Sequence, residues 1–332
     1  MTKKWTSESM LELIRRFQPV CVLAAAADLD LFDALASQPL TAQAMARKLA
    51  TDVRGTTILL DALTALRLIR KHNARYSIPN DVAKLLTSQG KTSVLAMAQH
   101  QANCLRRWAQ LAQTVKTGRP AKCTPSVRGF AADLAAFIGA MDNISAPVAA
   151  EVIKPLKNIT FQRLLDVGGA SGTWTMALLR GRPQATAILF DLKEVIPLAK
   201  RRLTAGKFIK RVELVPGDFT RDALPGGADF VWISAIIHQN SRQQNRELFG
   251  KAFRALLPGG KIAIRDILMA PDRTAPVAGA LFAVNMLVGT KGGGTFTFDD
   301  VRVDLQAAGF TQARVLHRDE GMHSIVIAKK QG

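Results

Sequence analysis

A glycine-rich segment near the middle of the chain carries the residues best suited to bind a ligand. Asp166 ends an apolar run that begins at Arg163, and Gly168, Gly169 and Gly172 follow it closely. Glycine lets a backbone turn sharply and approach a ligand without a Cβ clash. A turn of this kind, at the carboxyl edge of a parallel sheet, holds nucleotide-like ligands. The segment therefore predicts a strand, a ligand-binding turn and a helix.

The spacing of these glycines distinguishes between classes of ligand. A dinucleotide fingerprint needs glycines at i, i+2 and i+5, and ending that pattern on Gly172 would place its first glycine at Val167. The stretch instead reads Asp-x-Gly-x-small-x-Gly from Asp166 through Ala170, which resembles the first motif of S-adenosylmethionine-dependent methyltransferases. Ala170 stands where that motif more often has glycine. A purely structural turn in another α/β protein is the alternative.

Two further strand ends carry acidic side chains. Asp191, followed by Leu192, ends the second apolar run and lies 25 residues after Asp166. An acid at this place can accept hydrogen bonds from both ribose hydroxyls of a nucleotide, although it could also cap the next helix. The third run ends at Asp218 and Phe219, where methyltransferases place an acid facing the adenine amino group and an apolar residue on its ring. Three such ends favour a methyltransferase-like cofactor site.

The rest of the C-terminal half predicts the other elements of the same sheet. The apolar runs 229–234 and 261–267 predict a fourth and a fifth strand, with a helix between them over 241–257. The runs 313–317 and 324–328 predict a terminal antiparallel pair. Alternating strands and helices indicate a doubly wound, mostly parallel α/β sheet of the Rossmann-like type.

The N-terminal part of the chain has a different, helical character. Helices are expected over 41–49, with Thr41 as the N-cap, and over 56–69, while the stretch 71–79 could form a two-stranded wing. Together they suggest a winged helix. The predicted division of the chain is a winged-helix-like dimerisation domain over 1–91, a helical connector that contributes to the substrate pocket over 92–155, and an S-adenosylmethionine-binding domain over 156–332.

A winged helix in a chain with a net charge of +19 raises the question of DNA binding. The basic excess is spread out, because residues 1–100 hold 13 basic and 8 acidic side chains and residues 161–332 hold 24 and 15. A DNA-binding protein usually concentrates its basic residues on one face or one element. The helix over 56–69 is apolar around much of its surface, so burial against a second copy is the simpler expectation. The dense basic stretch 200–211 is expected on a solvated face.

The cysteine content and the hydropathy of the chain indicate the cellular compartment in which it is expected. Cys21, Cys104 and Cys123 form an odd set without metal-binding or redox spacing, which fits a reducing cytoplasm. The apolar run 20–27 is short and lies behind a long leading segment, so it predicts a buried helix rather than a signal peptide. No run is long enough to span a bilayer. We therefore expect a cytoplasmic protein with no metal, membrane or nucleic-acid partner.

The order of the motifs along the chain is itself informative. A helix that carries Phe137, Met141 and Ser145 precedes the glycine-rich turn, the later acids and a stretch that ends at His238. With the helical front half, this order resembles the two-domain O-methyltransferase family, which includes plant caffeate and flavonoid O-methyltransferases, acetylserotonin O-methyltransferase and bacterial natural-product enzymes. The resemblance implies a homodimer through a winged-helix domain, S-adenosylmethionine as cofactor, S-adenosylhomocysteine as product and no metal.

The resemblance also implies roles for individual residues. A histidine at the position of His238 takes the proton from the substrate hydroxyl as the oxygen attacks the sulfonium methyl, and an imidazole can accept a proton near neutral pH. Placement of the reactants in line supplies the rest of the catalysis. The implied cofactor site consists of Asp166, Gly168, Gly169, Gly172, Asp191, Leu192, Asp218, Phe219, Ser234 and Ser145. The implied substrate wall, for which ordinary core is the alternative, consists of Phe137, Met141, Asn285 and Met286.

Several positions depart from the family pattern. Gln239 follows His238 where aspartate is frequent, and Ser234 stands where many plant members have lysine. Plant members hold the base with acids in the loop that matches 291–295 and near the last strand, and this chain has no acid at either place. His238 could therefore be oriented by a backbone carbonyl, by Asp266 or by nothing. The three glycines of the same loop suggest a mobile flap.

The sequence as a whole predicts an S-adenosylmethionine-dependent O-methyltransferase that acts on a hydroxyl of a small aromatic molecule. One alternative is a methyltransferase fold whose chemistry is lost, or altered to C- or S-methylation. Another is a winged-helix regulator that senses a ligand through its C-terminal half. The variant His238→Ala tests the first alternative, and salt-dependent binding to duplex DNA tests the second.

Overall fold

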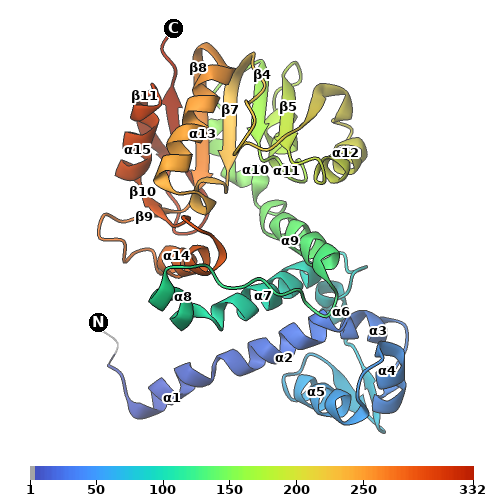
Figure 1. Cartoon of the computed structure of the whole chain (residues 1–332). Coiled ribbons are helices and arrows are strands. Elements are labelled where there is room, and N and C mark those ends of the chain that lie inside the picture. The colour runs from blue at the N-terminus through green and yellow to red at the C-terminus, as the bar shows by residue number, and fades with distance from the viewer. Residues whose placement is uncertain (1–3) are drawn as a thin grey trace. The chain divides into compact units, whose positions relative to one another are not determined.

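The computed structural model describes residues 4–332 and divides the chain into two compact units. The first unit holds the residues up to Arg106 together with Cys123–Asn143, and the second holds Arg107–Lys122 together with Ile144–Gly332. The segment predicted as a connector is therefore shared between the two units. Figure 1 labels the elements of both.

A seven-stranded sheet forms the centre of the second unit (Figure 1). Its strand order is β11-β12-β8-β7-β4-β5-β6, with parallel pairing from β8 to β6 and antiparallel pairing of β12 with β8 and with β11. The chain winds outward from β4 to β6 and then outward from β7 in the other direction, so the switch point lies between β4 and β7. The predicted doubly wound sheet with a terminal antiparallel pair is confirmed. The strands are β4 (Arg163–Val167), β5 (Thr186–Asp191), β6 (Val212–Pro216), β7 (Ala228–Ser234), β8 (Leu256–Asp266), β11 (Thr311–His317) and β12 (Ser324–Lys329).

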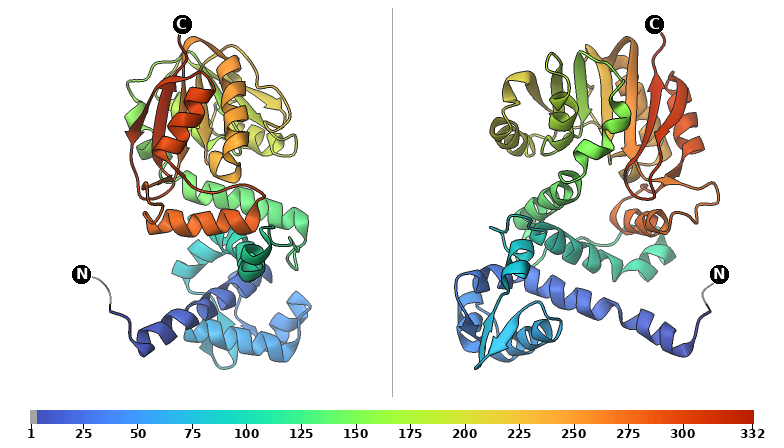
Figure 2. Two further views of the ribbon diagram at one scale, coloured as in Figure 1. Left: turned by 60° about the vertical axis from the view of Figure 1, so that its left-hand side comes forward. Right: turned by 180° about the vertical axis from the view of Figure 1, so that it is seen from behind.

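Helices cover both faces of this sheet, as Figure 2 shows from two sides. Along β4 the side chains alternate, so Leu165 joins the core under α13 and α15 while Leu164 joins the core under α10, α11 and α12. Burial on both faces explains why the parallel strands are nearly continuous apolar runs. The other elements of the unit are α8 (Leu111–Thr117), α10 (Ala149–Val152), η1 (Lys154–Leu156), α11 (Thr173–Arg180), α12 (Ile196–Ala205), η2 (Ile209–Arg211), η3 (Ile237–Gln239), α13 (Arg242–Ala255), β9 (Leu268–Met269), α14 (Val277–Gly289), β10 (Phe296–Thr297) and α15 (Phe298–Ala307).

The boundary between α13 and β8 differs from the prediction. Ser241 caps the helix by accepting a hydrogen bond from the backbone N of Gln244 at 3.2 Å, which agrees with the expected start. The helix ends at Ala255, however, and β8 already begins at Leu256. Gly259 adopts a φ of 77°, and the residues between the predicted helix and the predicted strand form an irregularity inside β8.

The first unit is helical with one small antiparallel sheet, in the order β1-β3-β2. Thr41 caps α4 as predicted, because its Oγ1 accepts a hydrogen bond from the backbone N of Ala44 at 3.2 Å. A hairpin of β2 and β3 occupies the place of the predicted two-stranded wing. The elements are α1 (Ser7–Arg15), α2 (Phe17–Asp28), α3 (Leu31–Ala36), β1 (Leu40–Thr41), α4 (Ala42–Leu49), α5 (Val53–Ala65), β2 (Arg70–His72), β3 (Arg75–Ser77), α6 (Asn80–Leu86), α7 (Leu95–Trp108) and α9 (Phe130–Ser145), the last two of which end in the second unit.

The helix α5 begins and ends earlier than the predicted range 56–69. Asp52 caps it through a 2.7 Å hydrogen bond from the backbone N of Gly55, and Arg67 leaves the helical conformation with a φ of 61°. Burial of the helix is one-sided, because Leu60 is fully buried whereas Ile58 is 55% exposed. Part of its apolar surface is therefore not covered by its own chain.

The basic stretch 200–211 lies mostly on the surface, as expected. Lys200, Arg201, Lys207 and Lys210 are exposed. Arg211 is an exception, since it is half-buried and its Nε donates to the carbonyl oxygen of Ala185 at 3.0 Å, which ties η2 to the loop before β5. This arginine is a structural residue of the sheet edge.

Between residues 4 and 332, no single helix is long and apolar enough to cross a membrane. One bent pair, Phe130–Ser145 with Ala149–Leu156, passes the same test of length and composition.

Candidate active site

The glycine-rich turn between β4 and α11 is tied to the end of β5. The backbone N of Ala170 donates to Oδ2 of Asp191 at 2.7 Å, and the backbone N of Leu192 donates to Oδ1 of the same carboxylate at 2.7 Å. Burial raises the pKa of Asp191. Each carboxylate oxygen can accept a second hydrogen bond. Asp191 therefore retains capacity for the hydroxyl groups predicted for it.

The backbone conformation and close packing of this turn explain why glycine occupies three of its positions. Gly168 and Gly172 have φ values of 68° and 79°, in the left-handed region that glycine enters freely. Gly169 has no such φ, but a Cβ on it would lie 2.6 Å from Cγ of Leu189. Ala170 also adopts a positive φ, 47°, at a cost of roughly 1 kcal/mol, and its hydrogen bond to Asp191 stabilises that conformation.

Asp166 is buried beneath the first turn of α11, with 1% of its surface exposed. Oγ1 of Thr175 donates to its Oδ2 at 2.5 Å. Burial, together with the nearby charge of Asp191, raises the pKa of Asp166 to about 7. The structure thus shows Asp166 supporting the turn, and its contact with a cofactor stays a prediction.

The end of β6 brings Phe219 next to the glycine-rich turn. A Cβ on Gly168 would lie 3.9 Å from Cε1 of Phe219 and 2.6 Å from Cδ1 of Ile236, so these side chains border the same place. Asp218 precedes Phe219, and its Oδ1 accepts hydrogen bonds from the backbone N and Oγ1 of Thr220 at 2.9 and 2.6 Å. These bonds lower the pKa of Asp218, so it is an ionised carboxylate at neutral pH.

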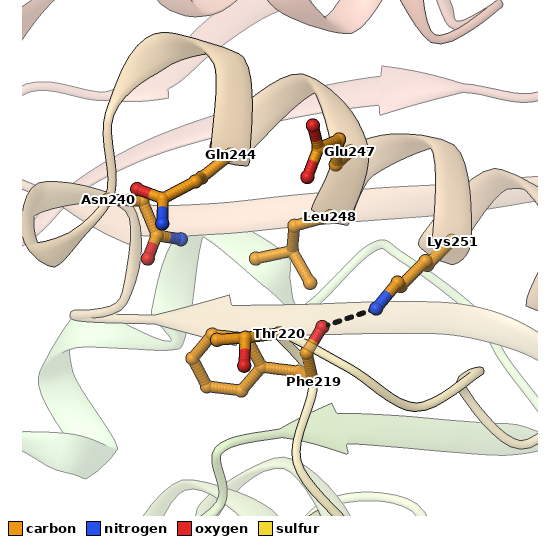
Figure 3. Close-up of a pocket in the computed structure, with 7 residues that line it drawn as sticks. All are labelled: Phe219, Thr220, Asn240, Gln244, Glu247, Leu248 and Lys251. Carbon is orange, nitrogen blue, oxygen red and sulfur yellow. Dashed lines mark hydrogen bonds between the residues drawn. The ribbon is translucent and has the colours of Figure 1, made fainter. Parts of the chain in front are cut away.

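A small cavity of about 60 Å³ lies between the loop after β6 and α13 (Figure 3). Lys251 closes one side by donating from Nζ to the carbonyl oxygen of Phe219 at 2.8 Å. A cavity of this size can hold water but not a nucleoside. Its lining consists of Phe219, Thr220, Asn240, Gln244, Glu247, Leu248 and Lys251.

Ser234, at the end of β7, is hydrogen-bonded to the side chain of Arg265, which belongs to none of the sequence motifs. Nε of Arg265 donates to Oγ of Ser234 at 2.7 Å, and the guanidinium lies 4.4 Å from the ring centre of Trp174. Arg265 is only 3% exposed, and burial lowers its pKa to about 10. The sequence feature that could have indicated this residue is a basic side chain within the mostly apolar strand β8. Of the remaining predicted cofactor residues, Ser145 is 8% exposed and Leu192 is 47% exposed.

His238 and Asp266 form a buried pair. Nδ1 of His238 lies 2.9 and 3.0 Å from the two carboxylate oxygens of Asp266, whose Oδ1 also accepts a 2.8 Å hydrogen bond from the backbone N of Ile267. A carboxylate only accepts hydrogen bonds, so Nδ1 carries a proton, and in the neutral imidazole Nε2 then presents a lone pair. Nε2 makes no hydrogen bond to any residue between 4 and 332. Of the three possibilities left open for the orientation of His238, the structure selects Asp266.

The glycine loop after α14 packs against the backbone of His238. The N of Gly294 donates to the carbonyl oxygen of His238 at 2.8 Å, and the N of Gly293 donates to Oγ1 of Thr290 at 2.8 Å. A Cβ on Gly293 would lie 2.5 Å from the same carbonyl oxygen of His238, whereas a Cβ on Gly294 would meet nothing within 4 Å. The loop predicted to be a mobile flap is thus hydrogen-bonded to the segment that carries His238.

Two of the four residues predicted for the substrate wall lie on α14. Phe282 of this helix packs edge-on against the imidazole of His238, with ring centres 4.8 Å apart, and Asn285 lies one turn further on. Met286 is 8% exposed. The other two predicted residues, Phe137 and Met141, lie on α9 in the first unit. Their meeting with Asn285 and Met286 stays a prediction.

Within residues 4–332 there is no group of three or more His, Cys, Asp or Glu side chains that could hold a metal ion.

The raised pKa of Asp166 predicts a pH dependence of stability. The folded state holds this proton up to about pH 7, whereas an unfolded aspartate loses it near 3.8. The folded state therefore binds more protons between these values, and the free energy of unfolding decreases as the pH rises through them. We expect Asp166→Asn to remove roughly 3 kcal/mol of this decrease between pH 5 and pH 8. Urea unfolding at both pH values checks it, and an identical decrease in variant and wild type would contradict it.

Comparison with family models identifies both parts of the chain. Residues 108–311 match a model described as the O-methyltransferase domain, and residues 11–89 match a model described as the O-methyltransferase dimerisation domain.

Individual proteins agree with the family models. A 3-hydroxy-5-methyl-1-naphthoate 3-O-methyltransferase from Streptomyces sahachiroi is 29% identical over 93% of this chain and 91% of its own length. The acetylserotonin O-methyltransferase of Gallus gallus is 27% identical over 93% of each chain. Among solved structures, PigF with S-adenosylhomocysteine has a TM-score of 0.85 at 23% identity, covering 98% of this chain and 100% of that one. Human N-acetylserotonin methyltransferase with S-adenosylmethionine has a TM-score of 0.79 at 24% identity, covering 100% of both.

The structural likenesses show the fold, and the family models cover most of the sequence. The chain therefore belongs to the two-domain O-methyltransferase family and is an S-adenosylmethionine-dependent O-methyltransferase.

Proposed function

We propose that the enzyme methylates a hydroxyl group of a small aromatic molecule, with His238 as the general base. One observation carries this proposal: the pair of His238 and Asp266 leaves Nε2 of a buried imidazole with a lone pair and no hydrogen bond to the rest of the described chain. Membership of the family indicates that the reaction is methyl transfer. The pair of His238 and Asp266 provides the proton acceptor that an alcohol or phenol needs.

The strand ends fit S-adenosylmethionine. Asp191 retains hydrogen-bonding capacity for ribose hydroxyls, Phe219 offers an aromatic face for adenine, and the carboxylates of Asp191 and Asp218 make this edge negative for a cationic ligand. When bound, the cofactor supplies an electrophilic methyl group on its sulfonium. The residues of this chain have to hold the cofactor, align the acceptor oxygen and exclude water.

His238 then removes the proton from the acceptor hydroxyl. Nε2 accepts that proton as the acceptor oxygen becomes bonded to the methyl carbon and the bond from that carbon to sulfur breaks. The sulfonium charge is thereby lost, neutral S-adenosylhomocysteine would be left, and the imidazole becomes a cation. Asp266 stabilises this cation because its carboxylate already accepts the hydrogen bond from Nδ1 at 2.9 Å. This chain lacks acids at the two plant positions, and the proposal assigns their role to Asp266.

An aromatic acceptor is supported by the relatives and by α14. The Streptomyces sahachiroi relative is named for a hydroxynaphthoate, and others are named for acetylserotonin, a tetracenomycin polyketide and a phenazine. Near His238, the helix α14 presents Phe282, and Met286 follows one turn later. Aromatic and methionine side chains suit a flat apolar ring.

We also propose that two chains associate through the N-terminal unit. The matched dimerisation model covers it, and its first two helices leave large apolar side chains uncovered by their own chain. Large apolar side chains that are exposed in such number are typical of protein interfaces. The arrangement of α3, α4, α5 and the hairpin of β2 and β3 supports its description as a winged helix. The exposed side chains of these two helices include Met10, Leu11, Ile14, Phe17 and Val20.

Replacement of the general base tests the mechanism. We expect His238→Ala to lower kcat by about 100-fold to 10,000-fold, because the acceptor hydroxyl loses its proton acceptor. Asp266→Asn should lower kcat by at least about tenfold, because the imidazole loses the group that fixes its tautomer. Steady-state methyl transfer to a responsive phenol measures both. His72→Ala, at an exposed position in the first unit, serves as the control. Turnover unchanged in His238→Ala would refute its role as base.

Two adjacent glycines provide a matched test of how His238 is supported. Gly293→Ala forces a Cβ within 2.5 Å of the carbonyl oxygen of His238, whereas Gly294→Ala meets no atom within 4 Å. We expect the first variant to lower kcat by about tenfold or more through displacement of the imidazole, and the second to stay close to wild type. Equal rates for the two variants would show that this packing does not position the base.

Cofactor binding is the first step to measure. Calorimetric titration with S-adenosylhomocysteine should show micromolar affinity, and NAD should not bind, because the glycine spacing differs from a dinucleotide fingerprint. A positive result justifies screening phenols for methyl transfer. Failure of the folded protein to bind S-adenosylhomocysteine would refute the assigned cofactor site.

A further inference from the structure

We propose that Trp108 is a positioning residue that fixes the side-chain amide of Asn285 as a hydrogen-bond donor toward the methyl acceptor. The acceptor would then carry a hydrogen-bond-accepting oxygen, such as a carbonyl, besides the hydroxyl that is methylated. This inference rests on the proposed function, because it takes α14 as one wall of the acceptor site.

The contact between the two side chains determines the orientation of the amide. Nε1 of Trp108 donates to Oδ1 of Asn285 at 2.9 Å, and both residues belong to the second unit. The two ends of an asparagine amide are otherwise hard to distinguish, and their assignment depends on the hydrogen-bond network. An indole N–H is only a donor, so it can pair only with the amide oxygen.

The amide nitrogen of Asn285 is consequently turned away from the indole. It makes no hydrogen bond to another residue of the described range 4–332, and the side chain is half-buried. A half-buried donor favours a ligand that brings an acceptor and disfavours one that brings a second donor. The specificity of Asn285 is thus set by Trp108, whose sequence position is 177 residues away.

The donor lies close to the reacting groups. Phe282 contacts the imidazole of His238 with ring centres 4.8 Å apart, and Asn285 follows it at i+3 on the same side of α14. Residues at this spacing are separated by roughly 5–6 Å at their Cβ atoms. A fused aromatic ring system can therefore place its hydroxyl near Nε2 of His238 and a carbonyl near the amide of Asn285.

The segment that carries Trp108 is attached to α14 on both sides of α8. Trp108 lies before α8, and the backbone N of Ala121, after it, donates to the carbonyl oxygen of Val288 at 3.0 Å. Gly118 ends α8 in the left-handed conformation, so the chain reverses and returns to α14. These two attachments hold the indole against Asn285.

The test uses two matched series of naphthols, one with a methyl ester and the other with an amino group at the same ring positions. Calorimetry of the protein saturated with S-adenosylhomocysteine gives the Kd of each compound. We expect wild type to bind at least one ester about tenfold more tightly than its amino counterpart, which is the effect of one hydrogen bond gained or lost.

Substitutions at both residues then test the orientation of the amide. 3-Benzothienylalanine in place of Trp108 keeps the ring shape but lacks the N–H, so the preference for the ester should fall to about threefold or less, with W108F behaving alike. Asn285→Asp keeps an oxygen for the indole but presents an acceptor, so the preference should reverse. Unchanged affinity for S-adenosylhomocysteine shows that the variants are folded.

Each outcome decides between the inference and the proposed function. Equal affinity of wild type for both series, or an unchanged preference with benzothienylalanine at 108, overturns the role of Trp108 and leaves the proposed function standing. Failure of every naphthol to bind overturns the inference together with the aromatic acceptor. A preference that follows Trp108, in an enzyme whose turnover does not depend on His238, overturns the assigned base alone.

Discussion

The hydrogen bond between His238 and Asp266 depends on the register of two parallel strands. β7 and β8 align Ser234 with Arg265, and the next residue on β8 is Asp266. Successive side chains on a strand point to opposite faces, so Arg265 lies by Trp174 on one face while Asp266 reaches His238 on the other. A shift of one residue would exchange the two and bring a guanidinium to the imidazole.

The same edge of the sheet gathers the remaining charged groups. Parallel strands end at a common edge, and β4, β5 and β6 end with acids there or just beyond it. The environments differ, because Asp166 is buried and has a raised pKa whereas Asp218 is hydrogen-bonded and has a lowered one. Burial also raises the pKa of Asp191, whose carboxylate holds the glycine-rich turn. One sheet edge thereby brings together three carboxylates with different environments, although they are far apart in the sequence.

Local pattern was sufficient to predict most of the strand ends. An apolar run that stops at an acid marks the carboxyl end of a buried strand. This pattern predicts the end of β5 at Asp191 and the end of β4 at Asp166, one residue before its observed end. The sequence pattern does not reveal where β8 starts, because Leu256 continues the apolar pattern of the preceding helix. The partner of His238 stayed open for a different reason. Asp266 is 28 residues away, and only the strand register brings it near.

The two sides of the candidate site are built from separate parts of the chain, with consequences for specificity. The proposed cofactor edge and the pair of His238 and Asp266 come from strands between 163 and 266 and the loops that follow them. The proposed acceptor wall comes from α14 and from the segment Arg107–Lys122 attached to it. A substitution at Trp108 can therefore change which acceptor is preferred without moving the strand ends that hold the base. Chemistry fixed by a sheet and selectivity fixed by a helix contact can vary independently within one fold.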